Sequence, residues 1–283
     1  NAAQANSVAV GYSAQALGEA TVALGHEAGI NANGSYNTFV GKGAGENAVG
    51  DNNVMTGVTA GRNSQGNFNL MQGQQAGINS QGNFNALLGV GTGIGLVGNN
   101  NSALGYGAAG NVVGDDNTLL GLGAGYTLLG SNNASLGSFA GANAHGDVNV
   151  MIGTEAGSNA NSQYGVIIGA KAGQDSFGGG NIMLGSGAGM ASVGESNTII
   201  GDGAGLGATG NVNQISGRRA AVQMQGDYNV VSGTEAGTGT VGNHNVFTGT
   251  GAGAMTQGNS NVFTGRFSGV GTQGNNNVAM GQL

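Results

Sequence analysis

Glycine occupies every sixteenth position of this chain, from Gly25 to Gly281, without an exception. A second glycine column lies seven positions before the first column and is broken only by Ser162. A third glycine column lies four positions after the first column. An insertion anywhere in the chain would shift these columns out of phase. The unbroken period therefore predicts that each 16-residue unit is one turn of a solenoid, stacked on its neighbours.

Each unit follows the pattern G-x-x-N-Φ-Φ-Φ-G-x-x-A-G-x-x-x-x, in which Φ is mostly apolar. The triplet is often β-branched, as in Val166-Ile167-Ile168, and turn-forming residues bound it, so it predicts a short strand. Stacked turns then form a parallel sheet in an all-β fold, and about 16.5 turns at ~4.8 Å predict a rod roughly 80 Å long. We expect Gly and Asn to recur because the corners of each turn require positive φ or close backbone approach.

The charged residues support the same register. All 19 of them fall in six of the 16 columns, and none falls in a Gly, Asn, Ala or strand column. The commonest acidic column directly follows the second glycine column, and it never carries acids in two adjacent turns, as a stacked sheet requires. We therefore expect the charged columns to face water.

The two faces of the predicted strands are expected to pack against different partners. The middle residue of each triplet, such as Phe39 or Phe247, points away from the first and third residues, and with the Ala column it can fill a thin interior. The outer pair is also mostly apolar between Val22 and Ile200. Because a strand that is apolar on both faces is normally covered on both, we expect the outer face to pack against parallel copies of the chain.

The composition excludes several other classes of protein. The chain has 63 Gly but no Pro, which excludes collagen, and it has no Cys, which excludes disulfides and Cys-ligated metals. Its net charge of −7 and the lack of a long apolar run argue against nucleic-acid binding and against membrane insertion by this segment. Because the sequence begins with Asn1, we expect it to be a piece of a longer protein.

The N-terminal stretch Asn6-Ser7-Val8-Ala9-Val10-Gly11, followed by Ala14, Ala16 and Gly18, resembles the N-S-V-A-I-G-x-x-A-x-A-x-G unit of the YadA-like heads of trimeric autotransporter adhesins. The segment Thr21–Gly25 repeats its core one 14-residue unit later. The resemblance implies a left-handed parallel β-roll, three chains side by side, and attachment at the tip of a stalk on a Gram-negative outer membrane. Most units of this family are of the 14-residue type, whereas the later units here are of the 16-residue type, so the resemblance covers the inner strand but not the outer corner and its ligand preferences.

In such a parallel homotrimer, the outer strand residues form the contact between the chains. The predicted trimer core comprises Val166, Ile168, Ile182, Leu184 and Ile200. Polar residues interrupt the last triplet position near both ends of the rod, and if this column faces the axis they form polar rings that hold water or an anion. These residues are Thr56, Gln72, Ser216, Ser232, Thr248 and Thr264. The alternative is that large middle residues compensate there for lost packing.

Other candidate sites are weak. Glycine-rich stretches follow from the columns and lack the strand–loop–helix context of a phosphate-binding loop. His26, His145 and His244 are roughly seven turns apart, so no two of them can share a metal within one chain. We expect no catalytic residues, no metal site, no cofactor and no enzymatic activity. The paired bases Arg218 and Arg219 are a candidate patch for an anionic ligand, or else an exposed turn that improves solubility.

These observations predict a 14-residue type of repeat over residues 1–17 and 16-residue β-roll repeats over residues 18–283. The expected function is a surface-displayed trimeric adhesin head that attaches a Gram-negative cell to extracellular matrix, host cells or other surfaces through multivalent binding. The alternative is a receptor-binding or spacer segment of a trimeric phage tail fibre. The sequence does not identify the ligand, because a repetitive surface of Asn, Gly and Ser has no pocket signature.

Overall fold

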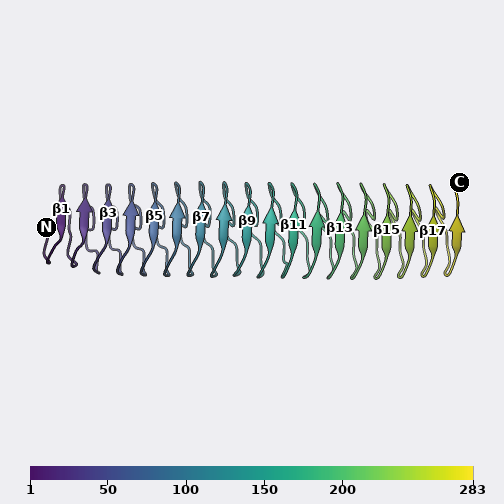
Figure 1. The fold of residues 1–283 in the computed structure, drawn as a ribbon, viewed down its shortest axis with the longest axis horizontal. Helices are drawn as coiled ribbons and strands as arrows, with labels where there is room; N and C mark the ends of the chain where they lie inside the picture. The colour runs from purple at the N-terminus through teal and green to yellow at the C-terminus, as the bar shows by residue number, and fades with distance from the viewer. Residues whose placement is uncertain (283) are drawn as a thin grey trace. The chain divides into compact units, whose positions relative to one another are not determined.

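The computed structural model describes residues 1–282, which divide into two units between Asn143 and Ala144. Each unit contains nine strands of three residues, in Figure 1 drawn as arrows. The first unit contains β1 Val8–Val10, β2 Val22–Leu24, β3 Thr38–Val40, β4 Val54–Thr56, β5 Leu70–Gln72, β6 Ala86–Leu88, β7 Ser102–Leu104, β8 Thr118–Leu120 and β9 Ala134–Leu136. The second contains β10 Val150–Ile152, β11 Val166–Ile168, β12 Ile182–Leu184, β13 Thr198–Ile200, β14 Gln214–Ser216, β15 Val230–Ser232, β16 Val246–Thr248, β17 Val262–Thr264 and β18 Val278–Met280.

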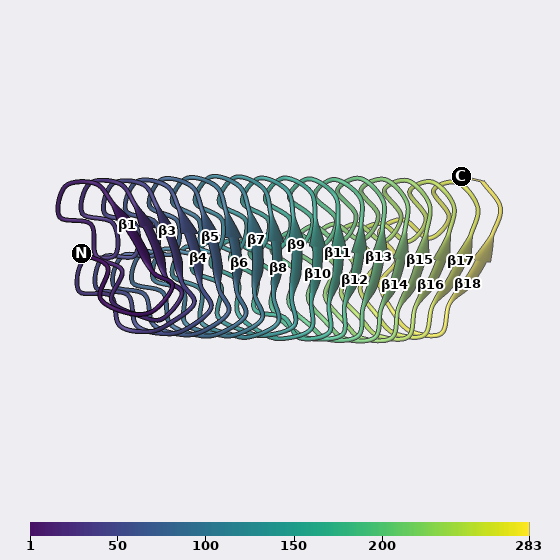
Figure 2. The same ribbon diagram turned by 60° about the vertical axis from the view of Figure 1, so that its left-hand side comes forward.

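Within each unit every strand pairs in parallel with the next strand along the chain, as Figures 1 and 2 show. The register advances by one 16-residue turn, so that Val166 lies beside Ile182, and only β1 and β2 pair with a 14-residue offset, Val8 beside Val22. A second line of parallel bridges runs along the stack outside these strands, for example from Asn161 to Phe177. The units are parts of a parallel β-solenoid of about 17 turns, which confirms the predicted strands, sheet and period.

No helix is present among residues 1–282, and this part of the chain therefore offers none that is long and apolar enough to cross a membrane.

Three columns of buried side chains fill the narrow interior of each turn; two are mainly apolar, and the third also holds Ser and Thr, such as Ser192 and Thr240. The middle strand residues are buried, as Ile167 and Phe247 show, and the Ala column is buried with them. This confirms the predicted interior. A third buried column, which sequence analysis missed, directly precedes the bridge residues and includes Leu128 and Met224. The varied residue types in this column hide its constant position in the turn.

The Asn column has a role different from the predicted one. The residues from Asn37 to Asn261 in this column are buried and do not have positive φ. In a representative turn, Asn213 Nδ2 donates to the carbonyl oxygen of Gly226 at 2.9 Å, and Asn213 Oδ1 accepts the N–H of Asn229 at 2.9 Å. Positive φ occurs instead one residue earlier, at Val212. The expected positive φ at this Asn column was wrong; the carboxamide instead bonds two backbone groups of the next turn, one with each end of the amide.

The glycine columns, in contrast, meet the predicted requirement at the corners. Gly169 has φ +135°, and a Cβ atom on it would lie 2.3 Å from the carbonyl oxygen of Gly185 in the next turn. Positive φ and close backbone approach therefore both select glycine at this corner.

Candidate functional site

The predicted contact residues form one continuous face across β11, β12 and β13. The middle residues Ile167 and Ile199 are 1% exposed, whereas Ile168 and Ile200 beside them are 37% and 41% exposed. The parallel register places Ile168 beside Leu184 and Leu184 beside Ile200. Val166, Ile182 and Thr198 form the neighbouring row on the same face. We call the outer residues of β11–β13 the strand face; it is a mainly apolar stripe that a single chain leaves in contact with water.

The six polar residues continue the same column in two separate groups. Thr56 lies beside Gln72 in the first unit. In the second unit the run Ser216, Ser232, Thr248 and Thr264 follows Ile200 directly. The residues behind this run remain apolar and buried, and the Phe247 and Phe263 rings stack at 5.5 Å. From β14 to β17 this outer column is polar, while the middle column behind it stays apolar.

The Arg218-Arg219 turn is less basic than its sequence suggests. Both side chains are exposed, but Asp202 lies one turn before Arg218 and Glu235 one turn after Arg219. The backbone bonds from Arg219 N–H to the Asp202 carbonyl at 2.8 Å and from Glu235 N–H to the Arg218 carbonyl at 3.0 Å keep these turns in contact. Two acids therefore accompany the two bases. The 16-residue spacing in the sequence would have identified Asp202 and Glu235 as neighbours of the two arginines.

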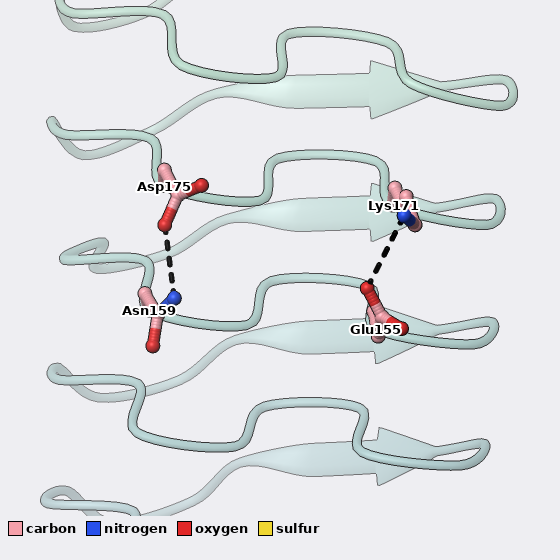
Figure 3. A network of polar contacts seen from close by, with 4 residues as sticks. All are labelled: Glu155, Asn159, Lys171 and Asp175. Atoms are coloured by element: carbon pink, nitrogen blue, oxygen red, sulfur yellow. Dashed lines mark hydrogen bonds and ion pairs between the residues drawn. The ribbon is translucent and has the colours of Figure 1, made fainter.

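Other polar columns pair along the stack (Figure 3). Lys171 Nζ lies 3.7 Å from a carboxylate oxygen of Glu155, one turn away. On the same two turns, Asn159 Nδ2 donates to Asp175 Oδ1 at 2.9 Å. Both pairs lie at the surface, where such contacts contribute little to stability. Their geometry shows that side chains one period apart in the sequence are direct neighbours.

The acidic column has a structural role that the sequence did not reveal. Its aspartates accept a backbone N–H from the turn before, as Asp51 Oδ1 does from Ser35 at 2.6 Å and Asp227 Oδ1 does from Asn211 at 2.7 Å. Asn and Ser side chains replace the acids in other turns. We call this series of bonds the corner ladder. Near its N-terminal end, the charge of Glu19 and a hydrogen bond with Glu19 raise the pKa of Tyr36 above its ordinary value.

The corner ladder is interrupted in the second unit, where the chain reads Gly178-Gly179-Gly180. A hollow of about 490 Å³ opens at this point between the turns that carry Tyr164 and Glu195. Its lining residues are Asn161, Gln163, Tyr164, Phe177, Gly178, Gly179, Gly180, Glu195 and Ser196. We call this hollow the corner pocket. Sequence analysis missed it because the lack of side chains at Gly179 and Gly180 is not a recognisable sequence motif.

The histidines do not form a metal site. His26 stacks on Tyr12 with the ring centroids 5.2 Å apart, and His244 stacks on Tyr228 at 5.1 Å. Across residues 1–282 no group of three His, Asp or Glu side chains is placed to hold a metal ion.

No protein-family model matches this chain, and no curated protein is significantly similar to it.

Proposed function

We propose that this chain is the head of a trimeric surface adhesin, in which three parallel copies cover one another's strand faces. The observation that carries the proposal is the apolar strand face, with Ile168 and Ile200 more than a third exposed in a single protomer. Covering the exposed part of one such side chain contributes about 1 kcal/mol. Two outer residues per turn repeat along the sheet, so the gain grows with the number of turns.

The resemblance of residues 6–18 to YadA-like heads supports three copies, a left-handed coil and display on a Gram-negative cell surface. In this arrangement the strand faces point to the threefold axis, and the corners and turns point outward. The proposed ligands are components of extracellular matrix or of host-cell and other surfaces. Three copies of one weak site increase the effective affinity through multivalency.

Surface retention tests the proposed function. The immobilised full chain should retain matrix proteins or cells, and an Ile168→Asp variant that cannot assemble should retain them about 10²–10⁴-fold less strongly. Retention by neither protein across matrix proteins, cells and abiotic surfaces, together with a turnover activity, would contradict the proposal.

The Arg218-Arg219 turn is a secondary candidate for contact with an anionic ligand. Replacing both residues by Ser should weaken retention more at low salt than at high salt, because the exposed charges are screened. Unchanged retention would assign the turn to solubility, in keeping with the neighbouring Asp202 and Glu235.

A further inference from the structure

Two breaks in the columns of the second unit fall in one corner. Ser162 replaces a corner glycine, and Gly165 replaces an Asn of the buried ladder. The two changes compensate sterically, because a Cβ atom on residue 165 would lie 2.7 Å from Ser162 Oγ. One turn later, Gly179 and Gly180 replace residues that carry side chains in other turns, such as Asp227 and Tyr228 at the same two positions. These glycines leave the corner pocket open.

The corner pocket combines aromatic and polar walls. Tyr164 is 67% exposed and Phe177 is 52% exposed, so both rings are accessible. The carboxylate of Glu195, the carboxamides of Asn161 and Gln163 and the hydroxyl of Ser196 belong to the same lining. The volume of about 490 Å³ lies within the ordinary range of small-molecule sites. None of these residues belongs to the strand face.

Two backbone donors at the corner pocket lack the acceptor that other turns provide. In intact turns the N–H after the corner glycine donates to a side chain one turn later, as Asn211 N–H does to Asp227 and Glu195 N–H does to Asn211. Within residues 1–282, the N–H groups of Gln163 and Gly179 have no such acceptor, and the Glu195 carboxylate accepts no hydrogen bond from the chain. The pocket therefore presents two donors and one charged acceptor together.

This combination discriminates between classes of ligand. A cation would pair with Glu195 but leave both N–H groups unpaired, and an anion would pair with the N–H groups but be repelled by Glu195. A hydroxyl group both accepts and donates, so a polyol can satisfy all of them. The apolar C–H face of a pyranose ring also fits the flat face of an exposed aromatic ring such as Tyr164.

We propose that the corner pocket binds a neutral saccharide, with one pyranose ring stacked on Tyr164 and its hydroxyls bonded to Glu195 and to the Gln163 and Gly179 N–H groups. The inference deepens the proposed function, on which it rests for its biological meaning, by naming the class of surface ligand. The binding itself requires only residues of one protomer.

Saturation-transfer NMR and equilibrium titration of the full chain test this assignment. The probes are methyl β-glucoside, methyl β-galactoside and N-acetylglucosamine as neutral pyranoses, choline as a cation and glucuronate as an anion. We expect at least one neutral pyranose to bind with a millimolar Kd, and choline and glucuronate to bind more weakly.

Two variants remove the pocket in different ways. Tyr164→Ala deletes the stacking ring, and Gly180→Tyr fills the hollow; each should weaken binding about tenfold or more. The filling residue is compatible with the fold, because the same corner position holds Tyr228 at φ 58° and a Cβ on Gly180 would lie 3.5 Å from Ser196 Oγ. Glu195→Gln should weaken binding about threefold to tenfold.

The matched control is Tyr228→Ala, which removes an exposed ring from the same column outside the pocket and should leave binding unchanged. Circular dichroism verifies that each variant retains the β-sheet signal. Binding of choline alone, binding of no probe, or binding that Gly180→Tyr leaves intact would overturn the assignment. Sedimentation separates the two proposals: a monomer that binds the sugar refutes only the trimer, and a trimer that does not bind it refutes only the pocket.

Discussion

The middle residues and the outer residues of the strands form two columns that differ in burial and in residue type. The middle column stays apolar and buried through β11–β17, from Ile167 to Phe263, because each turn must fill its own interior. The outer column is apolar at Ile168 and Ile200 but polar from Ser216 to Thr264, although most of its residues are exposed throughout. The interior of one protomer thus explains the first column but not the second. This difference favours the proposal that copies of the chain cover the apolar part of the outer column.

The largest expected effect comes from a charge on the outer column. Ile200→Asp would place three carboxylates around one buried axis in the proposed trimer, and each would cost several kcal/mol without a partner, so we expect complete loss of assembly. Sedimentation measures this loss. The matched control is Ser186→Asp, which adds the same charge on an exposed turn of the same unit. An Ile200→Asp chain that assembles like the control would show that the outer column is not an interface.

Shortening a side chain of the middle column should lower the stability of the fold. Phe247 is fully buried and stacks on Phe263, so Phe247→Ala should lower the free energy of unfolding by about 3–5 kcal/mol. Chemical denaturation measures the change. Thr234→Ala, on a turn of the same unit, should change it by less than about 0.5 kcal/mol and serves as the control. Equal effects of the two substitutions would contradict the interior that we describe.

Repairing the break in the buried Asn ladder should stabilise the chain. Ser162 Oγ is buried without a hydrogen-bond partner, and Asn181 Nδ2 bonds the Gly178 carbonyl at 2.7 Å, a group that residue 165 would otherwise bond. The double variant Ser162→Gly, Gly165→Asn restores the usual pattern and should raise the free energy of unfolding by about 1–2 kcal/mol.

Gly165→Asn alone should instead destabilise the chain, because its Cβ would meet Ser162 Oγ at 2.7 Å. A double-mutant cycle measures this coupling between the two positions. Additive effects of the two changes would contradict the compensation between Ser162 and Gly165.

The smallest expected effect concerns the polar part of the outer column. Thr248→Val keeps the shape of the side chain and removes its hydroxyl, and we expect stability to change by less than about 1 kcal/mol, since the Thr248 hydroxyl makes no hydrogen bond within residues 1–282. Thermal unfolding measures the change against Thr250→Val, on an exposed turn. A large loss for Thr248→Val alone would favour polar rings that hold water or an anion.

Much of the fold could be predicted from the sequence, because the period, the triplets and the apolar middle column each repeat many times. The role of the Asn column could not, since the bond from Asn213 to Gly226 joins two distant positions of the repeat and depends on how the corner folds back. The acids beside Arg218 and Arg219 were within reach through the 16-residue spacing. The corner pocket was hidden because it arises from side chains that Gly179 and Gly180 lack.

Sedimentation equilibrium of the unaltered chain tests the central claim most directly, since the claim is that copies of the chain cover the apolar strand face. We predict a folded species of three times 27.3 kDa with a β-sheet circular-dichroism signal, and no folded monomer on dilution. A folded, β-rich species of 27.3 kDa would contradict the account, because it would show that the outer column is stable in water without a partner.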